Sequence, residues 1–161
     1  MAANPNWPRW IFASFTTMFQ QALQAALPSI GFFVEGQDRQ TNTQTDFVEV
    51  RMNGPDFSQC SPSQWDVQVQ FNVLVQSIRD EKDFHKIHRT IGAVLACFPT
   101  NLTIYRYGDG TGDDQGVEGC LITKSGSKND GLIVSQFGQV QPDVPVMQAS
   151  VEGHYHGYLD N

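Results

Sequence analysis

The sequence contains little cysteine, and its few cysteines lie far apart. Only Cys60, Cys97 and Cys120 occur in 161 residues, and no two of them form a CxxC pair. An odd number at such wide spacings is not typical of a disulfide framework or of a zinc site. We therefore expect reduced thiols that pack as small apolar side chains.

Basic residues are scarce as well. Ten Lys and Arg residues are scattered along a chain that has 17 Asp and Glu residues, which gives a net charge of −7. Proteins that bind nucleic acid through its phosphates need clustered Lys and Arg. The composition therefore argues against specific binding to DNA. An acidic protein can still lie beside DNA in an assembly that must not adhere to it.

Long apolar runs are missing too. No 18 consecutive residues are apolar, so we expect no membrane span. The stretch MAANPNWPRW lacks the basic region and the apolar run of a signal peptide. At this length we expect a single domain, residues 1–161, that can bury a sizeable core.

The usual catalytic motifs do not occur. There is no GxSxG, no Walker A loop, and no GxGxxG between a predicted strand and a predicted helix. His154 and His156 share one face of a predicted strand, but no third metal ligand is evident. His85 and His88 lack the longer spacing, with a Glu inside it, of a metalloprotease helix. We expect structural histidines, no enzymatic activity and no cofactor.

The acidic, glycine-rich stretch GDGTGDDQGVEG (108–119) is the other place to look for a metal. Counted from Asp109, the sixth and twelfth positions of an EF-hand loop fall on Asp114 and Cys120, where the motif needs Gly and Glu. The stretch also lies between predicted strands instead of helices. We expect an exposed hairpin tip near 108–116.

Helical and alternating patterns divide the chain in the order α-β-β-β-α-β-β-β-β. One helix has Pro8 in its first turn and ends at Pro28, and the second begins at an Asp80 cap and ends at Pro99. The apolar stripe of the second helix comprises Phe84, Ile87, Ile91, Val94, Leu95 and Phe98. These patterns predict an α+β fold, with two helices packed on one face of an antiparallel, curved β-sheet. A second exposed loop is expected near 37–46.

The most informative stretch is WDVQVQFNVLVQ (65–76), in which apolar and polar residues alternate. It predicts a strand much longer than the usual five or six residues, reaching roughly 40 Å. We expect part of that length to lie against another chain. The candidate contact residues are the amides of its polar face, which hydrogen-bond across an interface without the desolvation cost of charge: Gln68, Gln70, Asn72 and Gln76. The alternative is a long, bent strand that serves one sheet.

The run WDVQVQFNVLVQSIRDEKDFHKIHRTIGAVLACF resembles the strand-then-helix centre of the tail terminator and tail completion proteins of tailed phages. The surrounding order is similar as well, with an N-terminal helix, two strands with a mobile hairpin loop, and C-terminal strands that end in a phrase like VMQASVEGHYHGY. The resemblance implies a homohexameric ring in the virion, assembled in the host cytoplasm. Such a ring caps the tail tube, fixes tail length and joins the tube to the head connector or stopper. It has no cofactor and catalyses no reaction.

A closed ring of this kind uses heterologous contacts between neighbouring copies. Genomic DNA would pass through it without specific binding, and acidic residues facing the lumen would repel that DNA. Candidates for the lumen, or for docking the tube or connector, are Asp109, Asp113, Asp114, Glu118, Asp38 and Arg39. Trp7 and Trp10 fit either the core or a subunit contact.

Three other functions are compatible with the sequence. The protein is another neck or tail component, such as a head–tail stopper, an adaptor or a tail tube protein. Alternatively, it is a small metal-dependent enzyme that uses His154, His156 and the acidic stretch 108–119. The third alternative is a ligand-binding α+β domain.

Overall fold

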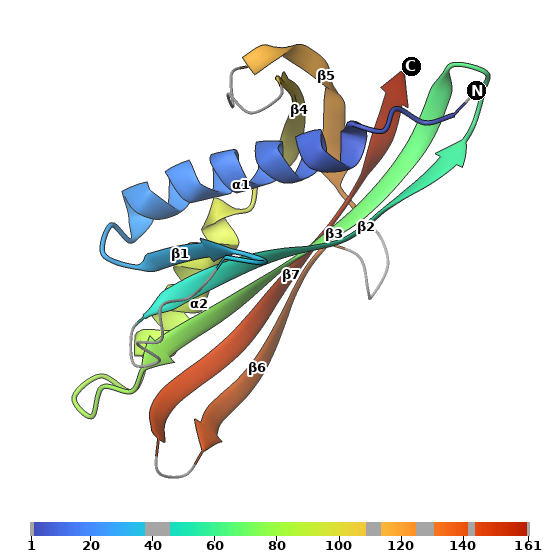
Figure 1. Ribbon diagram of the computed structural model, residues 1–161. Helices are drawn as coiled ribbons and strands as arrows, with labels where there is room; N and C mark the ends of the chain where they lie inside the picture. The colour runs from blue at the N-terminus through green and yellow to red at the C-terminus, as the bar shows by residue number, and fades with distance from the viewer. Residues whose placement is uncertain (1, 38–45, 109–113, 125–130, 142–143, 161) are drawn as a thin grey trace.

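The computed structural model describes residues 2–37, 46–108, 114–124, 131–141 and 144–160. Within these ranges, two helices and seven strands follow one another in the order that the sequence predicts (Figure 1). The helices are α1 (Trp7–Ala26) and α2 (Lys86–Cys97). The strands are β1 (Gly31–Val34), β2 (Phe47–Gln59), β3 (Gln64–Ile78), β4 (Asn101–Tyr107), β5 (Asp114–Thr123), β6 (Leu132–Gln141) and β7 (Val144–Asp160).

The strands form one strongly curled sheet, and both helices lie on the same side of it (Figure 1). The order is β1-β2-β3-β7-β5-β4, and β6 pairs with the part of β7 that β5 leaves free. The sheet is mixed, because β1 runs parallel to β2. The expected purely antiparallel sheet is therefore wrong. A hairpin turn near 37–46 would make β1 and β2 antiparallel. The connection between Val34 and Phe47 instead has about a dozen residues, which is the length that a parallel pair requires.

Strand β3 is a central strand and not an overhanging one. All 15 of its residues pair with β7, from Gln64 opposite Asp160 to Ile78 opposite Val146. Its other edge pairs with β2 from Trp65 to Gln76. The expectation that surplus length of this strand pairs with another chain is therefore wrong, because β2 and β7 are nearly as long or longer. The great length instead belongs to a three-strand ribbon of β2, β3 and β7.

The core lies between the apolar face of this ribbon and the two helices. The ring of Phe15 in α1 stacks on Phe71 of β3, with ring centroids 3.7 Å apart. Phe98, which directly follows α2, contacts Phe15 and Phe19. Alternate residues of β3 are buried beneath these rings: Val67, Val69, Phe71, Val73 and Val75. The predicted packing of two helices on one sheet face is confirmed.

Helix α2 begins later than the sequence predicts. Its first residue is Lys86 and its N-terminal cap position is His85. Asp80 instead accepts a hydrogen bond from the backbone of Lys82, 2.9 Å away, and so closes a turn before the helix. Phe84 precedes the helix and is 71% exposed, so its expected place in the apolar stripe is wrong.

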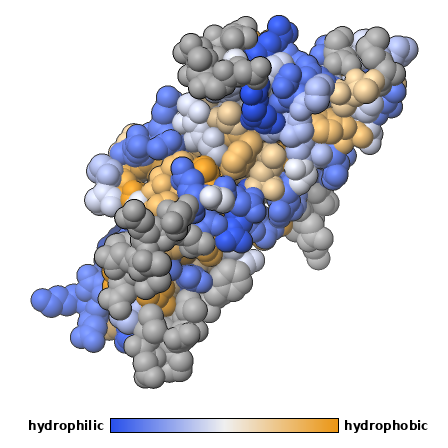
Figure 2. Space-filling model, viewed as in Figure 1, coloured by the Kyte–Doolittle hydropathy of each residue, from blue (hydrophilic) through white to orange (hydrophobic). Residues whose placement is uncertain are grey.

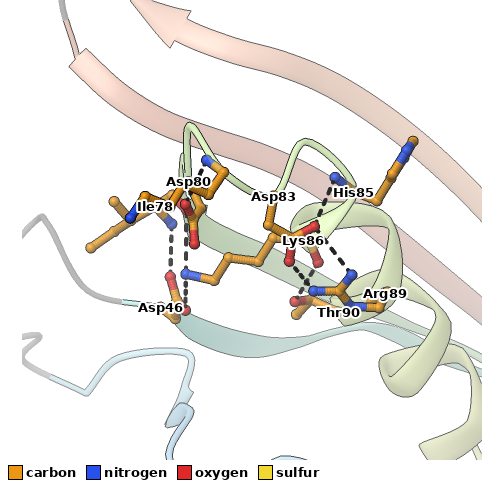
Figure 3. Close-up of polar contacts among 9 residues, drawn as sticks. Asp46, Ile78, Asp80, Asp83, His85, Lys86, Arg89 and Thr90 are labelled. Atoms are coloured by element: carbon orange, nitrogen blue, oxygen red, sulfur yellow. Dashed lines mark hydrogen bonds and ion pairs between the residues drawn. The ribbon is translucent and has the colours of Figure 1, made fainter.

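Charged contacts fix the segment that joins β3 to α2 (Figure 3). Asp46 accepts a hydrogen bond from the backbone N–H of Ile78 and forms an ion pair with Lys86, at 2.7 Å in both cases. Asp83 pairs with Arg89, one turn into the helix, and accepts a hydrogen bond from the backbone of His85. The Arg89 guanidinium holds the pKa of the Asp83 carboxyl below its ordinary value. These contacts join the start of β2, the end of β3 and the first turn of α2.

None of the helices in the described part of the chain combines the length and the apolar character needed to cross a membrane.

Candidate subunit interface

Among the residues that the structure describes, the metal-site candidates do not come together. Within the described ranges, no three His, Cys, Asp or Glu side chains lie close enough to hold an ion. His154 and His156 do share one face of β7, opposite Gln70 and Gln68 of β3. Residues 109–113 of the acidic stretch lie outside the described residues.

The two tryptophans offered as contact residues are held within the fold. Trp7 is fully buried, and its indole N–H donates to Glu118 over 2.7 Å. Trp10 donates to the backbone oxygen of Tyr107 over 2.9 Å. A subunit contact through Trp7 is therefore excluded, because its side chain belongs to the core of its own chain.

Glu118 is likewise not a lumen residue. Its side chain is only 5% exposed, and its second oxygen accepts a hydrogen bond from Arg106 over 2.5 Å. The expectation of a solvated acid failed because a β-bulge in the pairing of β4 with β5 leaves Glu118 without a residue opposite it and turns it toward α1. Alternation along β5 gives no signal of this displacement.

The amide face of β3 is largely satisfied by its neighbour β7. Gln70 and Asn72 both donate to Glu152, over 3.0 and 3.2 Å. Gln76 accepts a hydrogen bond from Gln148 and is buried. Gln76 is therefore no contact candidate, and the predicted roles of Gln70 and Asn72 are weakened by their internal partner.

Gln68 remains as an exposed member of this set. It lies in a row with His156 of β7 and Ile122 of β5 on the outer face of the sheet. Ile122 is 46% exposed, and Tyr158 in the adjacent row is 58% exposed. Sequence reasoning missed these two residues. Their positions could have been predicted from the alternation of the strands. Leu121 and Leu159 are buried, so their sequence neighbours Ile122 and Tyr158 point outward.

Other exposed apolar side chains are distributed unevenly. Figure 2 shows a face on which hydrophilic areas dominate, with orange areas over the middle of the molecule, along α1, and toward the end where the β2–β3 hairpin projects. Phe84 stands beside a hollow of about 290 Å³ whose apolar lining comes from Ile78, Ile87 and Met147.

The sheet edges differ more clearly than the faces. The outer edge of β4 is covered by α1, because Ser14 accepts a hydrogen bond from the backbone of Tyr105 and Trp10 donates to Tyr107. β1 has only four residues, and the side chain of Gln37 accepts a hydrogen bond from the Val34 backbone. Short or covered edges of this kind prevent unwanted strand pairing.

The outer edge of β2 is only partly protected. β1 covers it as far as Val50, and the pairing of β2 with β3 is irregular between Asn53 and Asp56, where Pro55 has no N–H to donate. Residues 56–59 beyond this irregularity pair regularly with β3 and leave their other edge without a partner among the described strands. Asp56, Ser58 and Gln59 are exposed.

Strand β6 is neither short nor paired on its second side among the described strands, although its pairing with β7 is irregular between Gln136 and Gly138 and between Gln139 and Gln141. It has ten residues, and β7 is its only partner among the strands that the structure describes. The sequence from 131 to 142 contains no charged residue, and β6 contains no proline. Leu132 and Val134 are 42% and 43% exposed. A long, uncharged edge strand whose second side is unpaired among the described strands is a template for pairing with another chain.

Comparisons with known proteins show the fold and nothing more. No family model and no curated protein matches the sequence. Twenty-three chains of solved structures resemble this one. One of them, a protein whose name states no function, aligns with a TM-score of 0.54 at 12% identity, over 92% of this chain and 94% of its own. The curled sheet with two helices is therefore a fold that occurs in other proteins.

Proposed function

We propose that this protein is a structural virion component of a tailed phage, a tail terminator that assembles as a ring of identical subunits. The ring caps the tail tube and joins it to the head connector. In this proposal the partners are further copies of the chain, the tail tube protein and the connector, and the protein acts without a cofactor.

The observation that carries the proposal is the uncovered edge of β6. Among the described strands, the edge of β1 is short, that of β4 is covered by α1 and that of β2 is interrupted at Pro55, whereas β6, although its pairing with β7 shifts twice, presents ten residues without a charge. A monomer with such an edge is prone to uncontrolled pairing. A defined partner strand removes that liability, and a subunit in a closed ring always has a neighbour to supply one.

The resemblance of the β3–α2 region to tail terminators supports the finer part of the proposal. The charge balance supports it as well, because a protein with a net charge of −7 does not retain DNA that passes through its lumen. The lumen and docking candidates remain part of the proposal. Asp38, Arg39, Asp109 and Asp113 lie outside the described residues, and Asp114 is the first residue of β5.

Electron microscopy of the purified protein tests this function. A tail terminator is expected to give rings of one size, each with a central opening. Long stacked tubes would indicate a tail tube protein instead. Particles of monomer size at all concentrations would overturn the proposal, because no joint between tube and connector can then be built from this chain alone.

A further inference from the structure

We infer that the first part of β6, residues 132–135, lies antiparallel against β1, residues 31–34, of a second copy of this chain. The apolar face of one sheet then continues into that of the next subunit. This inference rests on the proposed function, since it assumes that copies assemble side by side. It goes further by naming the two edges that meet.

The two strands lie at the same level along the sheet and on opposite sides of the ribbon of β2, β3 and β7 (Figure 1). The pairing registers place one residue of each strand in a single row across the sheet, which consists of Val34, Val50, Val73, Val151 and Val134. The pairing of β6 with β7 is regular from Leu132 to Gln136, so the row lies before both irregularities.

This valine row is buried in its middle and open at both ends. The three central side chains, those of Val50, Val73 and Val151, are fully buried in the core. At the two ends, Val134 is 43% exposed and Val34 is half-buried. A second copy placed alongside brings the open end of one row to the open end of the next, and apolar surface of both copies leaves water.

The next row of the sheet has the same form. It consists of Met52, Phe71, Gly153 and Leu132. Phe71 is fully buried, whereas Met52 is half-buried and Leu132 is 42% exposed. Leu132 and Val134 are two residues apart, so they point to the same face of the sheet. A neighbour beside β6 therefore covers both of these side chains at once.

Strand directions suit this contact. β1 is parallel to β2, and the successive antiparallel pairs from β2 through β3 and β7 make β6 run opposite to β2. Rotation about a ring axis along the strands changes neither the direction of a strand nor its level. β6 of one copy therefore meets β1 of the next as an antiparallel pair. Pairing of β6 with another β6 instead needs a twofold axis and ends at a dimer.

The backbone of β1 has groups to offer such a partner. The N–H groups of Gly31 and Glu35 donate toward β2, so the backbone groups of Phe32 and Val34 point to the other side. Gln37 accepts a hydrogen bond from the N–H of Val34. β2 is the one partner of β1 among the described strands. Four residues are too few to hold a chance strand, so the pairing depends on the apolar rows that the right partner completes.

Charge favours a second copy as the occupant. Residues 10–34, which include most of α1 and all of β1, are the longest stretch of the sequence without Asp, Glu, Lys or Arg. The stretch 131–142 also contains none. Each copy carries a net charge of −7, so two copies repel each other least where uncharged surfaces meet.

Lysine substitutions on the two edges test the contact from both sides. Val134→Lys and Val34→Lys each place a charge where apolar surface is to be buried. We expect each to weaken self-association at least roughly tenfold in sedimentation experiments. Ile122→Lys is the matched control, since Ile122 is 46% exposed and lies on β5, between β4 and β7. An equal effect of Ile122→Lys, or unchanged association of Val34→Lys, would contradict the inference.

A mixture of the two edge variants distinguishes unlike edges from like ones. The Val134→Lys chain keeps an intact β1 edge, and the Val34→Lys chain keeps an intact β6 edge. We expect the mixture to form a dimer with one chain of each kind and nothing larger. A mixture that associates no better than its separate components would overturn the inference.

Photo-crosslinking identifies the partner edge and does not depend on a stable lysine variant. A benzoylphenylalanine placed at Val134, in a mixture of isotopically light and heavy chains, is expected to form crosslinks between copies to a peptide that contains residues 31–34. Crosslinks to β6 of the other copy would show a twofold dimer and overturn the inference. Rings that form without crosslinks to 31–34 would overturn the inference and leave the proposed function standing. Absence of any association would overturn both.

Discussion

Substitution of Glu118 tests whether this acid is buried within the fold, as the structure places it, or faces the lumen of a ring, as the sequence predicts. The substitution Glu118→Ala removes the acceptor of the Trp7 indole N–H and the partner of Arg106. Trp7 is fully buried, so its N–H would find no water in place of the carboxylate. An unsatisfied buried donor costs about 1–3 kcal/mol.

The other contributions are smaller. Arg106 is half exposed, so its ion pair with Glu118 is screened by solvent and adds about 0–1 kcal/mol. Loss of one buried methylene adds about 0.8 kcal/mol. We therefore expect Glu118→Ala to lower the free energy of unfolding by about 2–5 kcal/mol. Glu118→Gln keeps an acceptor oxygen for the indole, and we expect it to cost about 1 kcal/mol.

Urea denaturation at a fixed protein concentration measures these differences, since association also stabilises the folded chain. A Trp7→Phe background isolates the hydrogen bond. In that background the effect of Glu118→Ala should shrink by about 1–3 kcal/mol, because the donor is already absent. A solvated acid facing a lumen would behave differently. If Glu118→Ala changed stability by less than about 0.5 kcal/mol, as surface substitutions usually do, the described position of Glu118 would be wrong.

Two further predictions concern the core. Phe98→Ala should lower the free energy of unfolding by about 3–5 kcal/mol, because the buried ring of Phe98 packs on Phe15 and Phe19. Phe84→Ala should change it by less than about 0.5 kcal/mol, because Phe84 is exposed. Similar losses for both substitutions in urea denaturation would refute the late start of α2. Burial raises the pKa of the Tyr155 hydroxyl, which donates to the Pro99 backbone over 2.7 Å. Above about pH 10 the unfolded chain releases this proton more readily than the folded chain, so stability should fall as pH rises. Tyr155→Phe should flatten that fall in thermal unfolding between about pH 9 and 11, and an unchanged slope would show that other groups cause it.

Much of the fold was predictable because its signals are local. The apolar stripe of α1 and the alternation of β3 each repeat with the period of a single element, so the helices, the strands and the face of β3 that packs inward follow from sequence. The start of α2 was harder. Asp80 and Asp83 both have the chemistry of a helix cap, and only the turn closed by Asp80 and the Asp83–Arg89 pair place the first residue at Lys86.

The contact surface could be predicted less well, because it depends on which strands are neighbours. The amides of β3 point outward as predicted, but Glu152 and Gln148 of β7 satisfy three of them, and neither partner is near them in sequence. The parallel course of β1 leaves no local pattern. The open edge of β6 can be recognised only from the order of the described strands. A strand is an edge strand when only one of its sides is paired, and the sequence does not show which strands are neighbours.

The most direct test of the central claim is the mass of the native assembly. The claim is that identical chains join into a closed ring in which a neighbouring copy covers the open edge of β6. Native mass spectrometry is predicted to find one dominant species at a fixed multiple of the 18.0 kDa chain, with six copies the expected number. A monomer at every concentration, or a dimer that never grows larger, would contradict it.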